Sequence, residues 1–589
     1  MQNNDESSSA ENVTAQDQAQ ELVEDQKVPG YSWYALGVLV LVYVLNFIDR
    51  NILSILANDI KADLGLTDAD LGFLYGTAFG VFYALFGIPL GRLADSWHRV
   101  KLMTAGLALW SAMTALSGFA KSGLALGAAR IGVGVGEATA SPSAYSLISD
   151  WFPKKMRGTA LAIYSAGLYI GGGVSLLIGG LIVEKWNAAY PGGGPLDLVG
   201  WQAAFLAVGV PGLLLAIWVF TLREPVRGQM DRLPEVKNEK PFRGFATELF
   251  AVIPPFTFMS SAQRGGASAR IAWLAMGLVV FGLAISQTSQ LLESGVSAPL
   301  AIAGYAAALA GIGLLLYFGR VPFALNFVAA VVTAGLAWLI GSLTGNFQQW
   351  IALGIGYYAV FSWAVSLRHR DLPTFKLIWG SPAFLYTILG YGMVAFASYS
   401  VSFWAAPYAE RVLGASKSVL GFWIGGGGAL GGFLGVIIGG RVSDWLRERN
   451  PGGRLMVVAF GVLAPVIPLI FAFTTENVAL FYFLNFVLSL FGSSALGAAA
   501  ATTQDLVLPR MRGTATATFF LSTTLVGLAL GPYMAGQVST MTGSLSTGVL
   551  SMLVVAPIGT VLLYLAYRTV PEAERTVLER ARAAGEQGV

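Results

Sequence analysis

The chain of 589 residues is 55% hydrophobic and only 12% charged, with a formal net charge of +3. Soluble proteins carry about 25% charged residues, so this composition excludes a set of ordinary soluble domains and favours a polytopic membrane protein. Cysteine is absent and His98 and His369 are the only histidines, which excludes disulfides, thiol catalysis and thiolate or histidine-rich metal sites. We therefore expect no metal and no cofactor, and the small positive charge indicates no nucleic-acid partner.

Residues 1–30 are rich in Gln, Asn, Ser and acidic residues, which predicts a disordered cytoplasmic tail. From Tyr31 onward, apolar runs of about 20 residues recur, each long enough to cross about 30 Å of hydrocarbon. Six fall in an N-terminal half, residues 31–223, at 32–57, 70–91, 101–120, 124–148, 158–183 and 200–222. Six more fall in a C-terminal half, residues 371–570, at 383–407, 417–440, 454–474, 477–500, 512–537 and 547–568. Residues 571–589 are predicted to form a second cytoplasmic tail.

The segment between the halves is unusual. Residues 224–270 are basic and contain several prolines, which predicts a cytoplasmic linker. Residues 271–370 form an inserted hydrophobic block with four more apolar runs, at 271–290, 298–317, 321–341 and 350–367, and none of the four contains a charge. An even number of helices returns the chain to the same side of the membrane. The favoured interpretation is a lipid-facing or packing insert of about four helices, and the alternative is a part of the transport path.

The positions of Lys and Arg predict the orientation, because cytoplasmic loops are enriched in both. Basic loops alternate with loops that are poor in bases. The basic loops carry Arg92, Arg99, Lys101, Lys154, Lys155, Arg157, Arg441, Arg447, Arg449, Arg454, Arg510 and Arg512. We expect both termini in the cytoplasm, the acidic loop 59–70 outside, and a multi-pass protein of a bacterial inner membrane.

Two signatures occur twice. "GRLADSWHRVK" at 91–101 is repeated in part as "GRVSDW" at 440–445, and "PKKMRGTA" at 153–160 returns as "PRMRGTA" at 509–515. Both offsets are about 350 residues, which indicates an internal duplication of a six-helix half. Duplicated halves are typical of secondary transporters that bind substrate between the halves, near the middle of the bilayer.

Charged residues inside the predicted helices mark a candidate site. Asp49, Arg50, Arg130 and Glu137 all lie in the N-terminal half, and each costs about 2.5–3.5 kcal/mol at the centre of a membrane helix. Asn46 lies one helical turn before Arg50, on the same face. Because desolvation favours the neutral form of a carboxyl group, we assign proton coupling to Asp49 and Glu137.

Arg50, Arg130 and Asn46 are assigned to substrate binding or ion pairing. A guanidinium fork suits a phosphate or carboxylate headgroup, so Arg50 would hold such a group. The alternative is a static ion pair that serves only helix assembly. In the C-terminal half, the stretch "YSVSFWAAPY" adds Tyr399, Phe403 and Trp404 as candidate substrate contacts.

A second group of charges follows the repeated signatures. These residues predict a cytoplasmic gate, in which a carboxylate caps a facing helix or pairs with an arginine in one state. The gate residues are Asp95, Arg99, Arg157, Asp444 and Arg512. The alternative is that these charges only determine topology.

These motifs also support a resemblance. The spacings Gly91-x-x-x-Asp95-x-x-x-Arg99-x-Lys101 and Arg130-x-x-x-Gly134-x-Gly136 resemble signatures of the major facilitator superfamily. "NFIDRNIL" together with "RIGVGVGEATASPSAYSLISDWFP" is similar to the spinster branch of lipid transporters. The resemblance covers both halves and not residues 271–370. It implies a major facilitator fold, an amphipathic substrate such as a lysolipid or sphingosine phosphate, and coupling through Asp49, Arg50 and Glu137.

The predicted protein is therefore an all-α secondary active transporter and not an enzyme, because no nucleophile–base pair or cluster of carboxylates marks a catalytic site. It would move an amphipathic substrate by proton-coupled alternating access, with substrate and protons competing for the same charges as in an antiporter. The alternative is a transporter of a small polar organic anion such as a sugar acid. The expected partners are the substrate, protons and membrane lipids, and we expect a monomer.

Overall fold

The computed structural model describes residues 28–231, 240–288 and 294–586. These residues form helices and no β-strand. Within these described ranges, fourteen helices are long and apolar enough to cross a membrane, which confirms a multi-pass membrane protein. The chain divides into two compact units. Unit 1 comprises the chain up to Gly244, Tyr386–Thr502 and Ser522–Arg568; unit 2 comprises Phe245–Leu385, Thr503–Leu521 and the chain from Thr569 onward.

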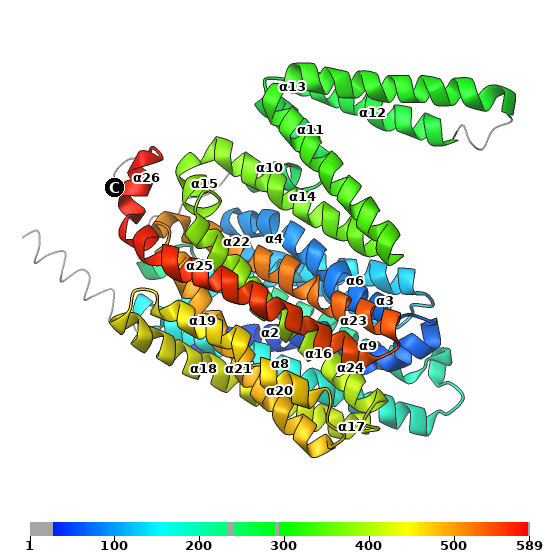
Figure 1. Cartoon of the computed structure of the whole chain (residues 1–589), viewed down its shortest axis with the longest axis vertical. Coiled ribbons are helices and arrows are strands. Elements are labelled where there is room, and N and C mark those ends of the chain that lie inside the picture. Colours follow the sequence, from blue (N-terminus) through cyan, green and yellow to red (C-terminus); the bar gives the residue numbers. More distant parts are fainter. Residues whose placement is uncertain (1–27, 232–239, 289–293, 587–589) are drawn as a thin grey trace, which may run out of the picture. The chain divides into compact units, whose positions relative to one another are not determined.

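Unit 1 contains most of both predicted halves (Figure 1). The helices of the N-terminal half are α2 (Gly30–Leu64), α3 (Asp68–Gly72), α4 (Ala78–Ser96), α5 (Arg99–Ser117), α6 (Gly123–Glu137), α7 (Ala140–Trp151), α8 (Lys154–Ala189) and α9 (Gly200–Phe220). Those of the C-terminal half, some of which extend into unit 2, are α16 (Pro382–Arg411), α17 (Lys417–Leu420), α18 (Gly426–Arg449), α19 (Gly453–Leu463), α20 (Val466–Ala472), α21 (Val478–Asp505), α22 (Arg512–Ser522), α23 (Gly531–Thr542), α24 (Leu545–Leu550) and α25 (Val555–Arg575). The predicted run 124–148 is divided between α6 and α7.

The duplication is visible in the backbone as well as in the sequence. A π-helical turn, η1 (Phe73–Thr77), precedes α4, and a second one, η5 (Gly421–Gly425), precedes α18. The two turns are about 350 residues apart, the same offset as the repeated signatures, as expected for an internal repeat. Each half therefore carries a widened turn at the same place in its second long helix.

Glycines on α8 allow α2 to approach closely. A Cβ atom on Gly171 would lie 2.3 Å from the Val44 carbonyl oxygen of α2, and one on Gly179 would lie 2.6 Å from Ile55 Cγ2. Small residues of this kind let two membrane helices pack backbone to backbone. The contact holds the helix that carries Asp49 and Arg50.

Unit 2 contains the segment between the halves. Its helices are α10 (Pro241–Val252, which begins in unit 1), α11 (Phe256–Arg264), α12 (Ala269–Thr288), α13 (Ser294–Thr344), α14 (Phe347–Arg370), α15 (Leu372–Ile378) and α26 (Val577–Ala583). The predicted linker 224–270 therefore includes helices α10 and α11. Helix α13 covers the second and third predicted runs and is interrupted at Arg320, where φ is 47°. The arrangement as a four-helix insert stays a prediction.

Helices reach into both predicted tails. Most of the tail 1–30 lies outside the described residues, and α2 already begins at Gly30. The predicted tail 571–589 is helical in its described part, because α25 continues to Arg575 and α26 follows it.

The contact between α8 and α2 makes a testable prediction. Gly171→Ala would place a methyl group against the Val44 carbonyl, and we expect it to destabilise the protein by about 1–3 kcal/mol. The matched control is Gly158→Ala on the same helix, where an added Cβ would meet no atom of the described residues within 4 Å. Thermal unfolding in detergent should show a lower midpoint for Gly171→Ala only; equal midpoints for the two variants would contradict this packing.

Candidate functional site

The structure brings together the four charged residues predicted inside the N-terminal half. Arg50 Nη2 on α2 donates to Glu137 Oε2 on α6 at 2.8 Å, and the two side chains are only 9% and 0% exposed. Arg130 Nη1 donates to the backbone carbonyl of Asp49 at 3.2 Å. Arg130 and Glu137 lie seven residues apart on α6 and so share a face toward α2. Two helices therefore supply all four charges.

Aromatic rings surround the Arg50 guanidinium. Its central carbon lies 4.9 Å from the ring centre of Phe47, 4.6 Å from that of Phe79 and 5.1 Å from that of Tyr83. A cation over aromatic faces is stabilised by the ring quadrupole, more strongly where water is excluded. Arg50 is therefore held by one carboxylate and three rings, two of them from α4.

Glycines on α6 bring its charges close to the neighbouring helices. A Cβ atom on Gly134 would lie 2.5 Å from the Phe79 carbonyl oxygen of α4, and one on Gly136 would lie 2.8 Å from the Gly106 carbonyl oxygen of α5. Larger residues at these positions would push α6 away from both helices. The backbone of α6 thus places Glu137 within reach of Arg50.

The Asp49 carboxylate differs from that of Glu137. Both of its oxygen atoms are buried, and the side chains of Trp110 and Thr114 on α5 lie beside it as hydrogen-bond donors. Its electrostatic interactions are attraction to Arg130 and repulsion from Glu137. Buried polar groups are almost always bonded to protein or to water. Asp49 therefore has neutral donors from α5 beside it, whereas Glu137 has the Arg50 guanidinium.

A cavity of about 290 Å³ lies in unit 1, between the two halves. Phe47, Asn51 and Tyr169 contribute from the N-terminal half. From the C-terminal half come Tyr399, one of the predicted contacts, and Asn485. The remaining wall is mainly apolar. Arg50 lies on α2 between the cavity-lining residues Phe47 and Asn51, and its guanidinium interacts electrostatically with the Tyr399 phenol. The charged group and the cavity are therefore adjacent.

Three other predicted contacts lie elsewhere. Phe403 stacks on Tyr75 with ring centres 4.4 Å apart, and Trp404 Nε1 donates to the Pro532 carbonyl at 2.9 Å. Both are fully buried and neither lines the cavity. Asn46 is buried beside Glu137. The structure therefore places Phe403 and Trp404 in helix packing, with Tyr399 at the cavity.

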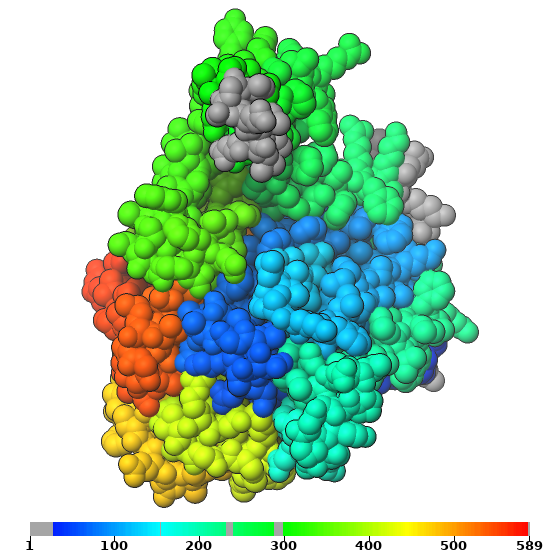
Figure 2. All heavy atoms as spheres, turned by 90° about the vertical axis from the view of Figure 1, so that its right-hand side faces the viewer, coloured from blue at the N-terminus to red at the C-terminus, as the bar shows by residue number. Residues whose placement is uncertain are grey.

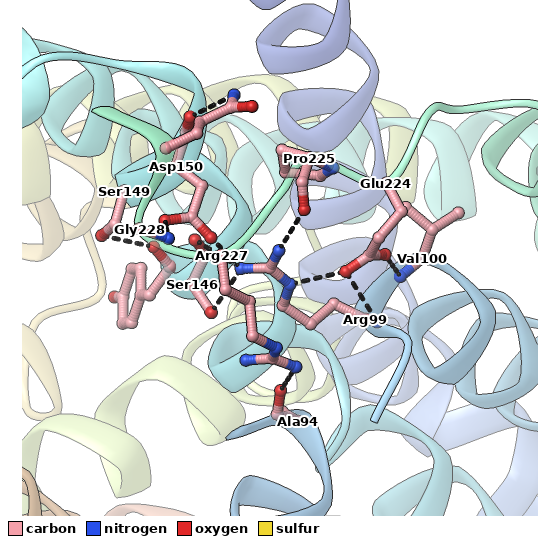
Figure 3. Close-up of polar contacts among 12 residues, drawn as sticks. Ala94, Arg99, Val100, Ser146, Ser149, Asp150, Glu224, Pro225, Arg227 and Gly228 are labelled. Atoms are coloured by element: carbon pink, nitrogen blue, oxygen red, sulfur yellow. Dashed lines mark hydrogen bonds and ion pairs between the residues drawn. The ribbon is translucent and has the colours of Figure 1, made fainter. Parts of the chain in front are cut away.

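Arg99, a predicted gate residue, is fully buried in a network between the N-terminal half and the segment that follows α9 (Figure 3). Its Nε donates to Glu224 Oε1 at 2.7 Å, Nη1 pairs with Asp150, and Nη2 donates to the Pro225 carbonyl at 2.9 Å. Arg227, in the same figure, donates to the Ala94 carbonyl at 2.7 Å. The pKa of Arg227 is lowered, mainly by burial and also by the nearby positive charge of Arg99. The network fastens the segment after α9 to the ends of α4, α5 and α7.

Three of the other predicted gate residues have charged or polar neighbours of their own. Asp95 interacts electrostatically with Arg92 and Arg227, and Arg157 Nε donates to the Ser149 carbonyl at 2.9 Å. Asp444 pairs with Arg454 at 3.3 Å. In unit 2, Arg512 is exposed at the start of α22. A gating role for these residues stays a prediction.

An ion-pair network that the sequence analysis missed joins the halves where α2 ends and α3 begins. Asp68 pairs with Lys61 at 2.6 Å and, across the halves, with Arg411 of α16 at 2.8 Å. It also accepts a hydrogen bond from Ser539 Oγ at 2.7 Å. Figure 2 looks onto this end, where the blue surface of α3 meets the orange surface of α23 and α24. Asp68 therefore ties three segments together.

A second pair crosses beside it. Lys417 of α17 lies 2.9 Å from Asp59 of α2 and 2.6 Å from Glu410 of its own half. The sequence does contain a signal for this network, because the acidic loop 59–70 lies on the same predicted side as Arg411 and Lys417. Opposite charges predicted on one side of the membrane favour a contact between the halves.

A family model described as the Major Facilitator Superfamily matches residues 39–374 and 387–586. The chain belongs to the Major Facilitator Superfamily. It is therefore a membrane transporter and not an enzyme.

The relatives span several kinds of transporter. An MFS-type efflux pump of Mycolicibacterium smegmatis is 25% identical over 87% of this chain and 86% of its own length. A probable galactarate/D-glucarate transporter of Bacillus subtilis is 31% identical over 33% of this chain and 41% of its own length. Protein spinster of Drosophila melanogaster is 28% identical over 34% of this chain and 31% of its own length. The last two alignments cover less than half of either protein.

One solved structure shows the same fold. A bacterial homologue of the human lysosomal transporter spinster, inward-facing and unoccupied, superposes with a TM-score of 0.60. It is 23% identical and covers 94% of this chain and 99% of that one. These comparisons confirm the resemblance to the superfamily and to its spinster branch.

The buried pair of Arg50 and Glu137 makes a stability prediction. Glu137→Leu leaves the guanidinium buried without a counter-charge, and breaking such a pair costs about 3–5 kcal/mol. The double variant Arg50→Met/Glu137→Leu removes both charges and should unfold at a higher temperature than Glu137→Leu alone. Thermal unfolding of the wild type, the single variants Arg50→Met and Glu137→Leu, and the double variant forms a double-mutant cycle. Purely additive effects would contradict a direct interaction between the two side chains.

Proposed function

We propose that this protein moves an amphipathic anion, such as a lysolipid or a sphingosine-phosphate-like molecule, by proton-coupled alternating access. The observation that carries the proposal is the buried pair of Arg50 and Glu137 beside a mainly apolar cavity. An arginine held by a carboxylate that can be protonated connects binding of an anion to binding of a proton.

The cavity supports the amphipathic substrate. Apolar side chains form most of its wall, while Asn51, Tyr399 and Asn485 provide a few polar groups. An acyl chain would pack against the apolar wall. Removing apolar surface from water in this way is favourable by about 25 cal/mol per Å². The headgroup would lie toward Arg50, whose planar fork can bind a phosphate or carboxylate through two parallel hydrogen bonds.

Protons would act through Glu137 and Asp49. Protonation of Glu137 weakens its hold on Arg50, and protonation of Asp49 weakens its attraction to Arg130. A ligand shifts a conformational equilibrium only by binding one state better than the other. Substrate and protons that compete for these charges would give the two states different affinities, which is the logic of an antiporter.

The network around Asp68 would close the external side in the state described here. Opening that side requires the Asp68–Arg411 and Asp59–Lys417 contacts to separate while the other side closes. The predicted gate residues Asp95, Arg99, Arg157, Asp444 and Arg512 would act on the cytoplasmic side. We place the protein in a bacterial inner membrane with both termini in the cytoplasm, as a monomer.

A second candidate substrate is a small polar anion such as a sugar acid. It is favoured by the relative described as a probable galactarate/D-glucarate transporter, at 31% identity over a third of this chain. Arg50 would bind the carboxylate, and Asn51 and Asn485 would bind hydroxyl groups. A small polar anion would leave the apolar wall without an apolar partner. The amphipathic substrate is therefore preferred.

Transport by proteoliposomes tests the proposal. With an imposed pH gradient, we expect accumulation of lysolipid, and Glu137→Gln should abolish the response to the gradient. The control Glu572→Gln changes an exposed carboxylate near the end of α25 that pairs with Arg575, and should behave as wild type. If Glu137→Gln still accumulates substrate in response to the gradient, the coupling role is wrong. Movement of sugar acids alone would overturn the lipid substrate.

Access to the cavity tests the network around Asp68. Because the chain has no cysteine, Ser402→Cys would provide a single reactive thiol in the cavity wall. Asp68→Asn should increase labelling of that thiol by a membrane-impermeant maleimide added outside cells, because the contact with Arg411 is weakened. The control is Asp63→Asn, at the same end, whose carboxylate accepts from Trp201 within its own half. Equal labelling in both backgrounds would show that Asp68 does not hold the halves together.

A further inference from the structure

Arg264, the last residue of α11 in unit 2, has unused hydrogen-bond donors. Its Nε and Nη2 atoms are buried and have no hydrogen-bond partner among the described residues. The pKa of Arg264 is lowered to about 10, mainly by burial and also by the nearby positive charge of Arg370. Guanidinium groups in partly buried positions normally have an acceptor. The position of Arg264 therefore favours an anion from outside the chain.

Other cations lie at the same end of unit 2. Gly265 packs directly on the backbone at Gly319, since an added Cβ would lie 1.7 Å from the Gly319 carbonyl oxygen. This contact places Arg264 beside Arg320, which is exposed and has a φ of 47°. On α14, Arg368 is exposed as well, and both it and Arg264 interact electrostatically with His369.

The carboxylates described at this end of unit 2 have cationic partners of their own. Glu248 pairs with Arg370, and Asp371 pairs with Arg510 at 2.7 Å. Arg264, Arg320 and Arg368, which we call the basic end of unit 2, therefore remain as a concentration of positive charge. Such a surface attracts anions.

Apolar side chains flank these cations. Tyr317 and Val321, on either side of Arg320, are 77% and 76% exposed. On α12, Trp273 and Phe281 are exposed as well. A tyrosine and an arginine where a long apolar helix is interrupted, as α13 is at Arg320, are typical of the membrane interface. A free inorganic anion would use the cations alone, whereas a phospholipid would use both the cations and the apolar surface.

We propose that the basic end of unit 2 binds an anionic phospholipid of the cytoplasmic leaflet. The phosphate is held by Arg264 and Arg320, and the acyl chains lie along the exposed faces of α12 and α13. The cytoplasmic leaflet is the one that carries anionic headgroups and attracts basic residues next to membrane helices. The inserted segment would then anchor the transporter in its lipid environment, separately from the substrate cavity.

Native mass spectrometry of the full-length protein tests this site with three probes: phosphatidylglycerol, phosphatidylcholine and inorganic phosphate. We expect phosphatidylglycerol to bind in preference to the other two. Arg264→Gln and Arg320→Gln should each weaken it about fivefold, the loss expected for one basic residue at the surface. Arg320 is exposed, so its replacement leaves folding intact even if that of Arg264 does not.

The control is Lys121→Ala, an exposed cation in a loop predicted on the opposite side. It removes the same charge and should leave phosphatidylglycerol binding unchanged. Equal binding of phosphatidylcholine, or an equal loss in Lys121→Ala, would overturn the specific site. Phosphate binding as tightly as phosphatidylglycerol would show a small-anion site in its place.

Discussion

The buried ion pair between Arg50 and Glu137 is the interaction on which the rest of the N-terminal half depends. Its two charges have left water for a membrane interior, and that cost is large unless geometry and further contacts offset it. The helix packing supplies both: glycines on α6 and α8 bring the backbones together, and the rings of Phe47, Phe79 and Tyr83 surround the cation. The packing of α2, α4, α6 and α8 therefore stabilises this one ion pair.

The same constraint separates the two carboxylates of the site. Glu137 is hydrogen-bonded to Arg50, whereas Asp49 lies near Arg130 with the side chains of Trp110 and Thr114 beside it. Two carboxylates with different partners respond differently to protons. The C-terminal half contributes the apolar wall of the cavity and, through Arg411 and Lys417, the contacts that hold one end of the halves together. Charge and shape are thus divided between the halves.

Much of this follows from local sequence rules. The cost of charges in apolar helices singled out Asp49, Arg50, Arg130 and Glu137, and repeated signatures revealed the halves. Long-range pairing was beyond reach, because Asp68 and Arg411 lie 343 residues apart and only their predicted side of the membrane relates them. In a helix that is apolar on all sides, the sequence does not indicate which side faces the cavity. Phe403 and Trp404 were therefore expected at the cavity, but they lie in helix packing. The helices inside the predicted linker were missed because its charges outweighed its short apolar stretches.

The central claim is that protonation of the two carboxylates biases the equilibrium between states. Spin labels at Ala62→Cys and Val412→Cys, both exposed near the Asp68 network, would report the distance between the halves at that end. Lowering the pH from alkaline to mildly acidic should shift the distance distribution in this background and leave it unchanged when Asp49→Asn and Glu137→Gln are added. A distance distribution that does not change with pH would contradict the account. So would a pH-dependent shift of the same size in the protein that carries both substitutions.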